Sequence, residues 1–363
     1  MEELAWGWKG DPDTFAILKT CAQSDGDKVV RRAALKGLGG GWKTDPETVV
    51  WLKACARSDN EWLIREAAVR ELARGWTADP ETLAILKVRA QSDAEADVRK
   101  AGVEELARGW NVDPDTLEIL KVRAQSDDDA DVRRVAVREL ARDWKADPNV
   151  LAILKFGAQF DNDWRVRETA VRELARGWKM NPEIPVILKG RAQSDDDMDV
   201  RAVALSELAR SWGADPDTLT IFSGRAQFDD AWPVRVTAVR ALAQSWRTDP
   251  GTLSILKDRA QSDGYWYVRR DALRCLVRDW KTESDTLRIL KMRARSDEAP
   301  GVRQCAVYEL ARGWKTDPDT IEILKTCALS DDELEVRQVA VRELARRWAH
   351  DPEITAWLAA LPT

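Results

Sequence analysis

The residues of this chain that could carry catalytic chemistry are few, and their spacing argues against an active site. The run from Gly37 to Thr44 resembles a phosphate-binding loop, but Trp42 stands where a glycine must let the backbone wrap a phosphate. His350 is the only histidine, so neither a histidine-based triad nor a histidine metal cluster can form. We therefore expect a protein that is not an enzyme and that has no cofactor and no metal.

Acidic side chains and cysteines are frequent enough to be tested as ligand sets. The acidic runs 127–129 and 195–197 lack the glycine turn and the distal glutamate of a calcium loop, so we interpret them as solvated caps of helices. The five cysteines show no Cys-x-x-Cys spacing, and their number is odd. We expect free thiols in a reducing compartment, which favours a cytoplasmic location.

Arginine pairs are better candidates for contact with another macromolecule. In each pair the two residues stand one helical turn apart, and Glu139, Glu173 and Glu343 lie three residues before the second arginine of their pair, where they can neutralise it. A salt-bridged, solvated face is one interpretation. If the guanidinium groups are free, they favour acidic partners or phosphate backbones. The pairs are Arg138/Arg142, Arg172/Arg176, Arg274/Arg278 and Arg342/Arg346.

Aromatic side chains form the second candidate set. Four tryptophans stand apart by multiples of 34 residues, but Lys28, Ala96 and Pro300 occupy the same position elsewhere. A position that packing required would not vary so freely in size. We interpret these tryptophans, and two tyrosines beside the last of them, as a rim that anchors a partner. The candidate residues are Trp62, Trp164, Trp232, Trp266, Tyr265 and Tyr267.

The element that positions both sets is a repeat of 34 residues. Tryptophan recurs at this spacing from Trp8 to Trp348 without a slip, which defines ten full repeats over residues 8–347. A stub at residues 1–7 matches the end of a repeat, and residues 348–363 match the start of one. Since no linker interrupts the array, we predict one domain over residues 1–363.

Each repeat predicts two helices joined by a tight turn. In residues 76–109, Asp79 caps a first helix whose apolar side includes Leu86, Asp93 marks the turn, and Gly109 suits a left-handed residue that ends the second helix. Helices of about 12 residues cannot bury their apolar sides alone, so neighbouring repeats must stack. The expected fold is an all-α solenoid, a right-handed superhelix of stacked antiparallel helix pairs.

Acidic and basic columns also recur in every repeat. Aspartate recurs ten times at the turn between the helices, from Asp25 to Asp331, and arginine follows each six residues later, from Arg31 to Arg337. We expect these side chains to pair within or between repeats. Such a ladder would satisfy helix ends and set the rise from one repeat to the next.

These columns carry a resemblance to a known family. The signature Asp-x4-Val-Arg-x2-Ala, as in Asp127, Val132, Arg133 and Ala136, resembles that of HEAT and HEAT-like repeats over essentially the whole chain. The proline departs from the family pattern, since it stands at the start of the first helix and not inside it. The resemblance implies that the second helices line the concave side. Similar tryptophan-rich repeats occur in bacterial and especially cyanobacterial proteins.

The resemblance and the candidate side chains together predict a scaffold or sensor module that binds a protein or peptide along the second helices and the Trp rim. Two alternatives stay open: HEAT-like DNA glycosylases imply nucleic-acid binding in an Arg-lined groove, and HEAT-like subunits of phycobilin lyases imply pigment attachment. The net charge of −6 gives no global attraction to nucleic acid or anionic lipid. No apolar run reaches the roughly 20 residues that span a bilayer, so no membrane partner is expected.

Overall fold

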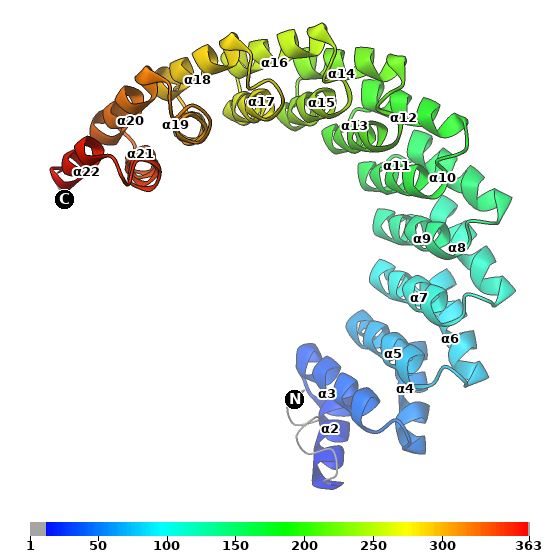
Figure 1. The fold of residues 1–363 in the computed structure, drawn as a ribbon. Helices are drawn as coiled ribbons and strands as arrows, with labels where there is room; N and C mark the ends of the chain where they lie inside the picture. Colours follow the sequence, from blue (N-terminus) through cyan, green and yellow to red (C-terminus); the bar gives the residue numbers. More distant parts are fainter. Residues whose placement is uncertain (1–11, 362–363) are drawn as a thin grey trace. The chain divides into compact units, whose positions relative to one another are not determined.

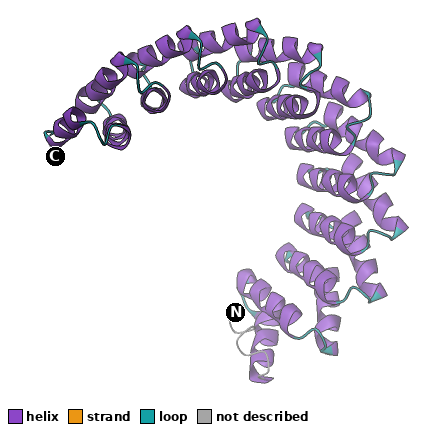
Figure 2. Cartoon of the chain, in the orientation of Figure 1, coloured by secondary structure: helices purple, strands orange, loops and turns teal. Residues whose placement is uncertain are grey.

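The computed structural model describes residues 12–361, which fall into two compact units that meet at Asn181 and Pro182. Within residues 12–361 the chain forms 21 α-helices and no strand, as predicted for an all-α protein (Figure 2). The stub at residues 1–7 and Trp8 lie outside the described residues. The single domain expected from the uninterrupted array stays a prediction, and the two units are described separately.

The N-terminal unit holds five helix pairs. Within it, each second helix packs on the first helix of its own repeat and on the second helices of adjacent repeats, so that the two kinds of helix form two rows (Figure 1). The first helices are α2 (Pro12–Ser24), α4 (Pro46–Ser58), α6 (Pro80–Ser92), α8 (Pro114–Ser126) and α10 (Pro148–Phe160). The second helices are α3 (Lys28–Gly41), α5 (Trp62–Gly75), α7 (Ala96–Gly109), α9 (Ala130–Asp143) and α11 (Trp164–Gly177).

The C-terminal unit repeats this arrangement and ends in one short helix of the last half-repeat. Stacked helix pairs of this kind form an α-solenoid. The first helices are α12 (Glu183–Ser194), α14 (Pro216–Phe228), α16 (Pro250–Ser262), α18 (Ser284–Ser296), α20 (Pro318–Ser330) and the terminal α22 (Pro352–Ala359). The second helices are α13 (Met198–Trp212), α15 (Trp232–Ser245), α17 (Trp266–Asp279), α19 (Pro300–Gly313) and α21 (Leu334–Arg347).

The first helices begin where the sequence predicts. The Asp79 carboxylate accepts a hydrogen bond from the N–H of Glu81 at 2.9 Å, and Pro80 occupies the first helical position, where a missing N–H has no consequence. Helices α6 and α7 have 13 and 14 residues, slightly more than expected. No helix within the described residues is long and apolar enough to cross a bilayer.

The second helices end differently from the expectation. Gly109 is the last helical residue of α7, and no glycine among residues 12–361 has a positive φ. Trp110 closes the helix: its N–H donates to the Leu106 carbonyl at 2.9 Å, and its own carbonyl accepts from the N–H of Asp113 at 3.1 Å. The prediction of a left-handed glycine is therefore wrong, because the N–H and the carbonyl of the tryptophan make the hydrogen bonds that end the helix and form the turn.

The core consists of small and branched apolar side chains rather than indoles. Every alanine of the column from Ala22 to Ala328 is buried, and a Cβ atom on Gly102 would come within 2.8 Å of the backbone nitrogen of Ala90. Helices α6 and α7 thus approach so closely that only glycine fits. Most tryptophans of the regular column are half-buried, and among residues 12–361 only Trp280 and Trp348 of this column are buried, with 9% and 6% of their surface exposed. These indoles cover the edge of the core.

The predicted Asp–Arg ladder is confirmed, and it runs between repeats. Arg99 donates from Nε and Nη2 to the two carboxylate oxygens of Asp127 in the next repeat, at 3.0 and 2.7 Å. Its Nη1 donates to the Asp93 carbonyl of its own repeat at 2.9 Å. The same two-point pairing joins Arg65–Asp93, Arg133–Asp161, Arg201–Asp229, Arg235–Asp263, Arg269–Asp297 and Arg303–Asp331.

The ladder carboxylates are held in their charged form. Burial by itself raises the pKa of Asp127, but the hydrogen bonds from Arg99 and from the N–H of Asp129 outweigh it and bring the pKa below the ordinary value. The same opposition lowers the pKa of Asp297. A planar guanidinium that binds two oxygens and a carbonyl therefore fixes each repeat against the next.

Candidate binding surface on the second helices

Most of the run that resembles a nucleotide-binding loop is the end of a helix. Gly37 to Gly41 belong to α3, and a Cβ atom on Gly39 would come within 2.8 Å of the Cβ atom of Glu71. The glycines therefore allow α3 and α5 to pack closely. All five cysteines are free, and no group of three or more His, Cys, Asp or Glu side chains in the described part of the chain is arranged to hold a metal.

The irregular tryptophan column is not uniformly exposed. Each of its four members is the first residue of a second helix. Trp164 has 38% of its surface exposed, whereas Trp62, Trp232 and Trp266 are half-buried. The position is accessible in all four repeats, but neighbouring side chains cover part of the indole in three of them.

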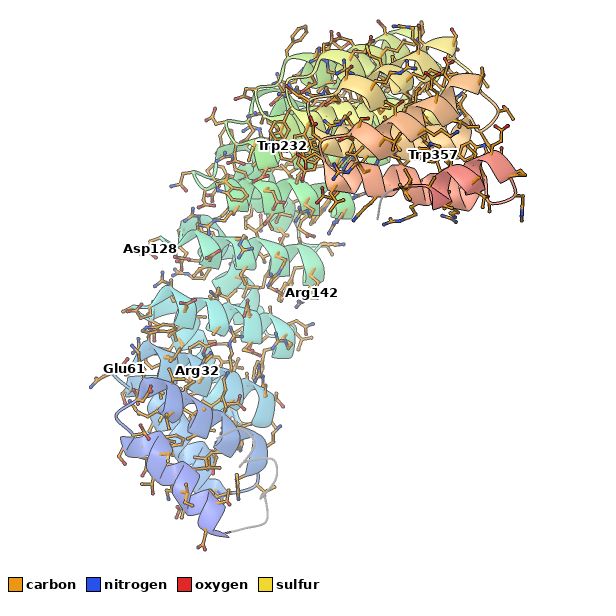
Figure 3. All side chains as sticks on the ribbon, turned by 90° about the vertical axis from the view of Figure 1, so that its left-hand side faces the viewer. Arg32, Glu61, Asp128, Arg142, Trp232 and Trp357 are labelled. Carbon is orange, nitrogen blue, oxygen red and sulfur yellow. The ribbon has the colours of Figure 1, made fainter. Side chains whose placement is uncertain are left out.

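The structure brings four of the predicted aromatic residues together at the starts of α15 and α17. The ring of Trp232 stacks on Tyr265 and Tyr267, with ring centres 4.7 and 5.0 Å apart, and Trp266 stacks on Tyr267 at 3.7 Å (Trp232 is labelled in Figure 3). The Arg270 guanidinium lies over Trp266 and Tyr267, at 5.0 and 4.6 Å. We call Trp232, Tyr265, Trp266, Tyr267 and Arg270 the aromatic cluster.

Trp266 also has a packing partner in the next repeat. A Cβ atom on Gly301, near the start of α19, would come within 2.6 Å of the indole Cζ3 atom. The glycine thus leaves room for the ring. Trp266 therefore contributes to the contact between repeats as well as to the surface, whereas Trp232 lies against the two tyrosines.

The arginine pairs of the N-terminal unit are engaged in ion pairs. Arg138 donates to Glu139 at 2.8 Å, and Arg142 contacts both Glu139 and, at 2.7 Å, Asp143. Figure 3 shows Arg142 and Asp128 at opposite ends of the α9 repeat, so this network is separate from the ladder. On α11, Arg172 pairs with a glutamate one turn earlier, and Arg176 is not free either.

The pair on α17 has different surroundings. Arg274 and Arg278 face Arg240 of α15, and Arg247 just after that helix, across a cleft of about 590 Å³, which we call the arginine cleft. The cleft lies at the C-terminal halves of α15 and α17, on the face of the C-terminal unit that its second helices form. Its remaining lining residues are Ala243, Gln244, Asp271, Cys275 and Asp279.

Positive charge exceeds negative charge in the arginine cleft. Asp279 pairs with Arg278 at 2.6 Å and with Arg247 at 3.7 Å, and Asp271 pairs with Arg240. No carboxylate among residues 12–361 lies within ion-pair distance of the Arg274 guanidinium. Four guanidinium groups thus face two carboxylates, which leaves a net charge of +2.

One column of the repeat explains why the cleft opens here. In seven of the ten repeats the residue three positions before the last arginine is a glutamate, as in Glu105–Arg108 at 2.7 Å and Glu207–Arg210 at 2.5 Å. Ala241 and Cys275 occupy this column in α15 and α17. Burial raises the pKa of the Cys275 thiol to about 11, so the thiol stays uncharged at neutral pH.

Arg240, Arg247, Asp271 and Asp279 are not among the residues predicted from the sequence. The signal that could have found them is the loss of the column glutamate in two consecutive repeats, at positions 241 and 275. Of the arginines that were predicted, only Arg274 and Arg278 line the cleft. The cleft and the aromatic cluster therefore share helices α15 and α17, and we treat them together as the candidate surface.

Comparison with known proteins agrees with the architecture. Yeast importin-β (Kap95p) is 13% identical, with a TM-score of 0.66, over 98% of this chain and 53% of that chain. Kap95p in a structure described by its binding to RanGDP is 14% identical with a TM-score of 0.65, over 98% and 53%. Kap121p is 17% identical with a TM-score of 0.60, over 97% of this chain and 43% of that chain.

The chain thus spans about half the length of these solved structures. At such identities the likeness shows a shared α-solenoid fold. No curated protein matches this chain. The model of HEAT repeats matches residues 15–107, 116–209, 184–277 and 263–345. Repeats of this one kind account for most of the sequence, and the chain belongs to the HEAT repeat family.

Proposed function

We propose that this chain is a non-enzymatic scaffold that binds a protein or peptide partner over the second helices, with its main contact on α15 and α17. The observation that carries the proposal is the aromatic cluster. Two of its rings stand where other repeats have Lys28, Ala96 or Met198, so a repeat can form without an indole at this position. Tryptophan, tyrosine and arginine are the side chains that contribute most to protein interfaces.

The architecture and its relatives support the same class of function. Stacked repeats present an extended surface whose size exceeds that of a compact domain's binding face. Kap121p, which shares the fold, has been solved bound to Nup53p and bound to RanGTP. For the present chain these complexes support a protein or peptide as the partner class. Free thiols in a reducing environment favour the cytoplasm as the place of action.

The two alternatives have less support from the geometry. Nucleic-acid binding along the whole second-helix face would require free cations, but Arg138, Arg142 and Arg172 are engaged by carboxylates. Pigment attachment would require an apolar pocket, and the cleft on α15 and α17 is lined by charged side chains. Both remain outcomes of the experiment below.

The test compares the proteins that the full chain captures with those that two variants capture. In Trp232→Ala/Tyr265→Ala, two rings of the aromatic cluster are removed. In Phe228→Ala, a ring is removed that is 81% exposed at the end of a first helix in the same repeat as Trp232. We expect the first variant to lose a partner that the second retains, with melting temperatures close to that of the unchanged chain.

The partner is then purified, and its direct binding to the full chain is measured. Capture is repeated after nuclease treatment, and binding of a labelled DNA duplex to the full chain is measured at 50 mM salt. Retention of the partner by Trp232→Ala/Tyr265→Ala would remove the aromatic cluster as the contact. Duplex binding that weakens steeply with salt would replace the protein partner with nucleic acid.

A further inference from the structure

The arginine cleft has the charge and the donors to recognise one particular chemical group. Arg240, Arg247, Arg274 and Arg278 present planar forks of N–H donors, and the net charge of the cleft is +2. A phosphate monoester carries about −1.5 to −2 charges at neutral pH and three acceptor oxygens, whereas a carboxylate carries one charge and two oxygens. The phosphate monoester therefore matches the cleft in both charge and number of acceptors.

We propose that the arginine cleft binds a phosphorylated side chain of a peptide partner; this proposal rests on the scaffold function proposed above and specifies its ligand. Arg274 is the first contact, since its guanidinium pairs with neither carboxylate of the cleft; its neighbours on α19 are the Cys305 thiol and the more distant Glu309. Arg278 and Arg247 share Asp279 and keep further N–H donors for the phosphate oxygens. Half-exposed ion pairs of this kind rearrange at little cost.

The flanking helices argue for a single phosphate and against a nucleic-acid strand. Glu207 on α13 and Glu309 on α19 occupy the glutamate column on the two sides of the cleft. Burial raises the pKa of Glu309, and the nearby Arg312 and Arg274 oppose this effect. A nucleic-acid backbone places charges every few ångströms and would meet these carboxylates on leaving the cleft. A single phosphate on an otherwise uncharged peptide would not.

The aromatic cluster predicts how the peptide continues. Trp266 lies 8 residues before Arg274 and 12 before Arg278 on the same helix, which corresponds to about 12–18 Å along its axis. An extended peptide covers this distance in about four or five residues. The ligand is therefore a phosphorylated residue with an aromatic residue about four or five positions away, because aromatic rings pair well with the exposed edge of the cluster.

The test uses the full chain and three synthetic ten-residue peptide libraries with randomised flanks and a fixed central residue: phosphoserine, serine or glutamate. We expect the phosphoserine library to be retained about tenfold better than the serine library at 150 mM salt, which corresponds to about 1.4 kcal/mol. Sequencing of the retained peptides should show an aromatic residue at the predicted spacing.

The matched variants are Arg274→Gln/Arg278→Gln and Arg138→Gln/Arg142→Gln, two arginine pairs of identical spacing on α17 and α9. The first should reduce retention of phosphoserine peptides to the level of serine peptides, and the second should leave it unchanged. Equal loss in both would show a general charge effect and overturn the assignment. Better retention of the glutamate library would replace phosphate with carboxylate, and tighter binding of a single-stranded DNA twelve-mer would assign the cleft to nucleic acid.

Failure of this inference can be separated from failure of the scaffold function. Suppose that Arg274→Gln/Arg278→Gln still captures the physiological partner, and that phosphatase treatment of the partner does not change its capture. The cleft then does not bind phosphate, while the scaffold function stands. If Trp232→Ala/Tyr265→Ala also captures it, the surface on α15 and α17 is not the binding site at all.

Discussion

Helices α9 and α17 have the same arginine pair and differ in the residue beside it. On α9, Glu139 lies between Arg138 and Arg142 and contacts both. On α17, an uncharged Cys275 stands in the same position beside Arg274 and Arg278. The comparison teaches that one buried position per repeat decides whether the first arginine of the pair has a carboxylate within ion-pair distance, since Arg278 keeps its pair with Asp279.

The two regions do not differ in what holds the repeats together. Arg99 binds Asp127 before α9, and Arg269 binds Asp297 after α17, each through two hydrogen bonds of 2.6–3.0 Å. The ladder is therefore common to both units, and the residues that differ, Glu139 and Cys275, take no part in it. This separation allows the shared and the differing parts to be tested one at a time.

Acid should have the largest effect, because it removes the whole ladder at once. The folded-state pKa values of Asp127 and Asp297 are lowered, so their contribution to stability is present above the unfolded value of about 4 and is lost as the pH falls through the lower folded values. We expect both units to lose helicity over the same range below about pH 4. Far-UV circular dichroism and regional hydrogen exchange measure this. One unit that stays protected while the other unfolds would show that the ladder is not the shared element.

Removal of a single ladder carboxylate should have the next largest effect. Asp127→Ala and Asp297→Ala each leave a buried guanidinium without its partner, which should cost about 3–5 kcal/mol in the free energy of unfolding. Urea unfolding followed by hydrogen exchange of the neighbouring repeats measures the loss. The control is Asp128→Ala, since that carboxylate is 88% exposed and should cost less than about 0.5 kcal/mol. Unequal losses at positions 127 and 297 would contradict the equivalence of the two regions.

The aromatic residues should show an intermediate difference between the units. Trp266→Ala removes ring stacking and the contact with Gly301, so we expect a loss of about 2 kcal/mol. Trp164→Ala removes a more exposed indole and should cost about 0.5 kcal/mol. Thermal and urea unfolding of the two variants test this order. Equal losses would mean that Trp266 has no special role in packing.

An exchange of the residues at positions 139 and 275 should have the smallest effect on stability and sharpen the comparison most. Cys275→Glu recreates the Arg–Glu–Arg arrangement of α9 on α17, so it should weaken phosphopeptide binding about tenfold, or about 1.4 kcal/mol, and change stability by less than about 1 kcal/mol. Fluorescence anisotropy with a selected phosphopeptide measures the binding.

Two further variants complete the exchange. Cys275→Ser is the neutral control and should keep the affinity of the unchanged chain. Glu139→Cys should create weak phosphopeptide binding on α9, since it removes the carboxylate that Arg138 and Arg142 share. If Cys275→Glu binds as well as the unchanged chain, the missing glutamate is not what makes the cleft a binding site.

Much of the scaffold could be predicted because its information is local and repeated. Asp79 and Pro80 set the start of a first helix through their own backbone and side-chain geometry, and the same pattern recurs in most repeats. The spacing of Asp and Arg predicted the ladder but left open whether it joins residues within or between repeats. The glycine at the end of α7 was misinterpreted, because the following tryptophan closes the turn with its backbone.

The sequence by itself determined the helices, the length of the repeat, the family and the positions that pack between repeats. Each of these depends on short-range geometry that recurs in every repeat. Only the tertiary structure decided which candidate side chains are free. Arg142 and Arg278 each pair with a carboxylate on their own helix, but the side chains that face Arg278 across the cleft come from the preceding repeat. The packing of Trp266 against Gly301 likewise depends on a residue of the next repeat. Charge balance and exposure are properties of such neighbours, and a helix does not specify them alone.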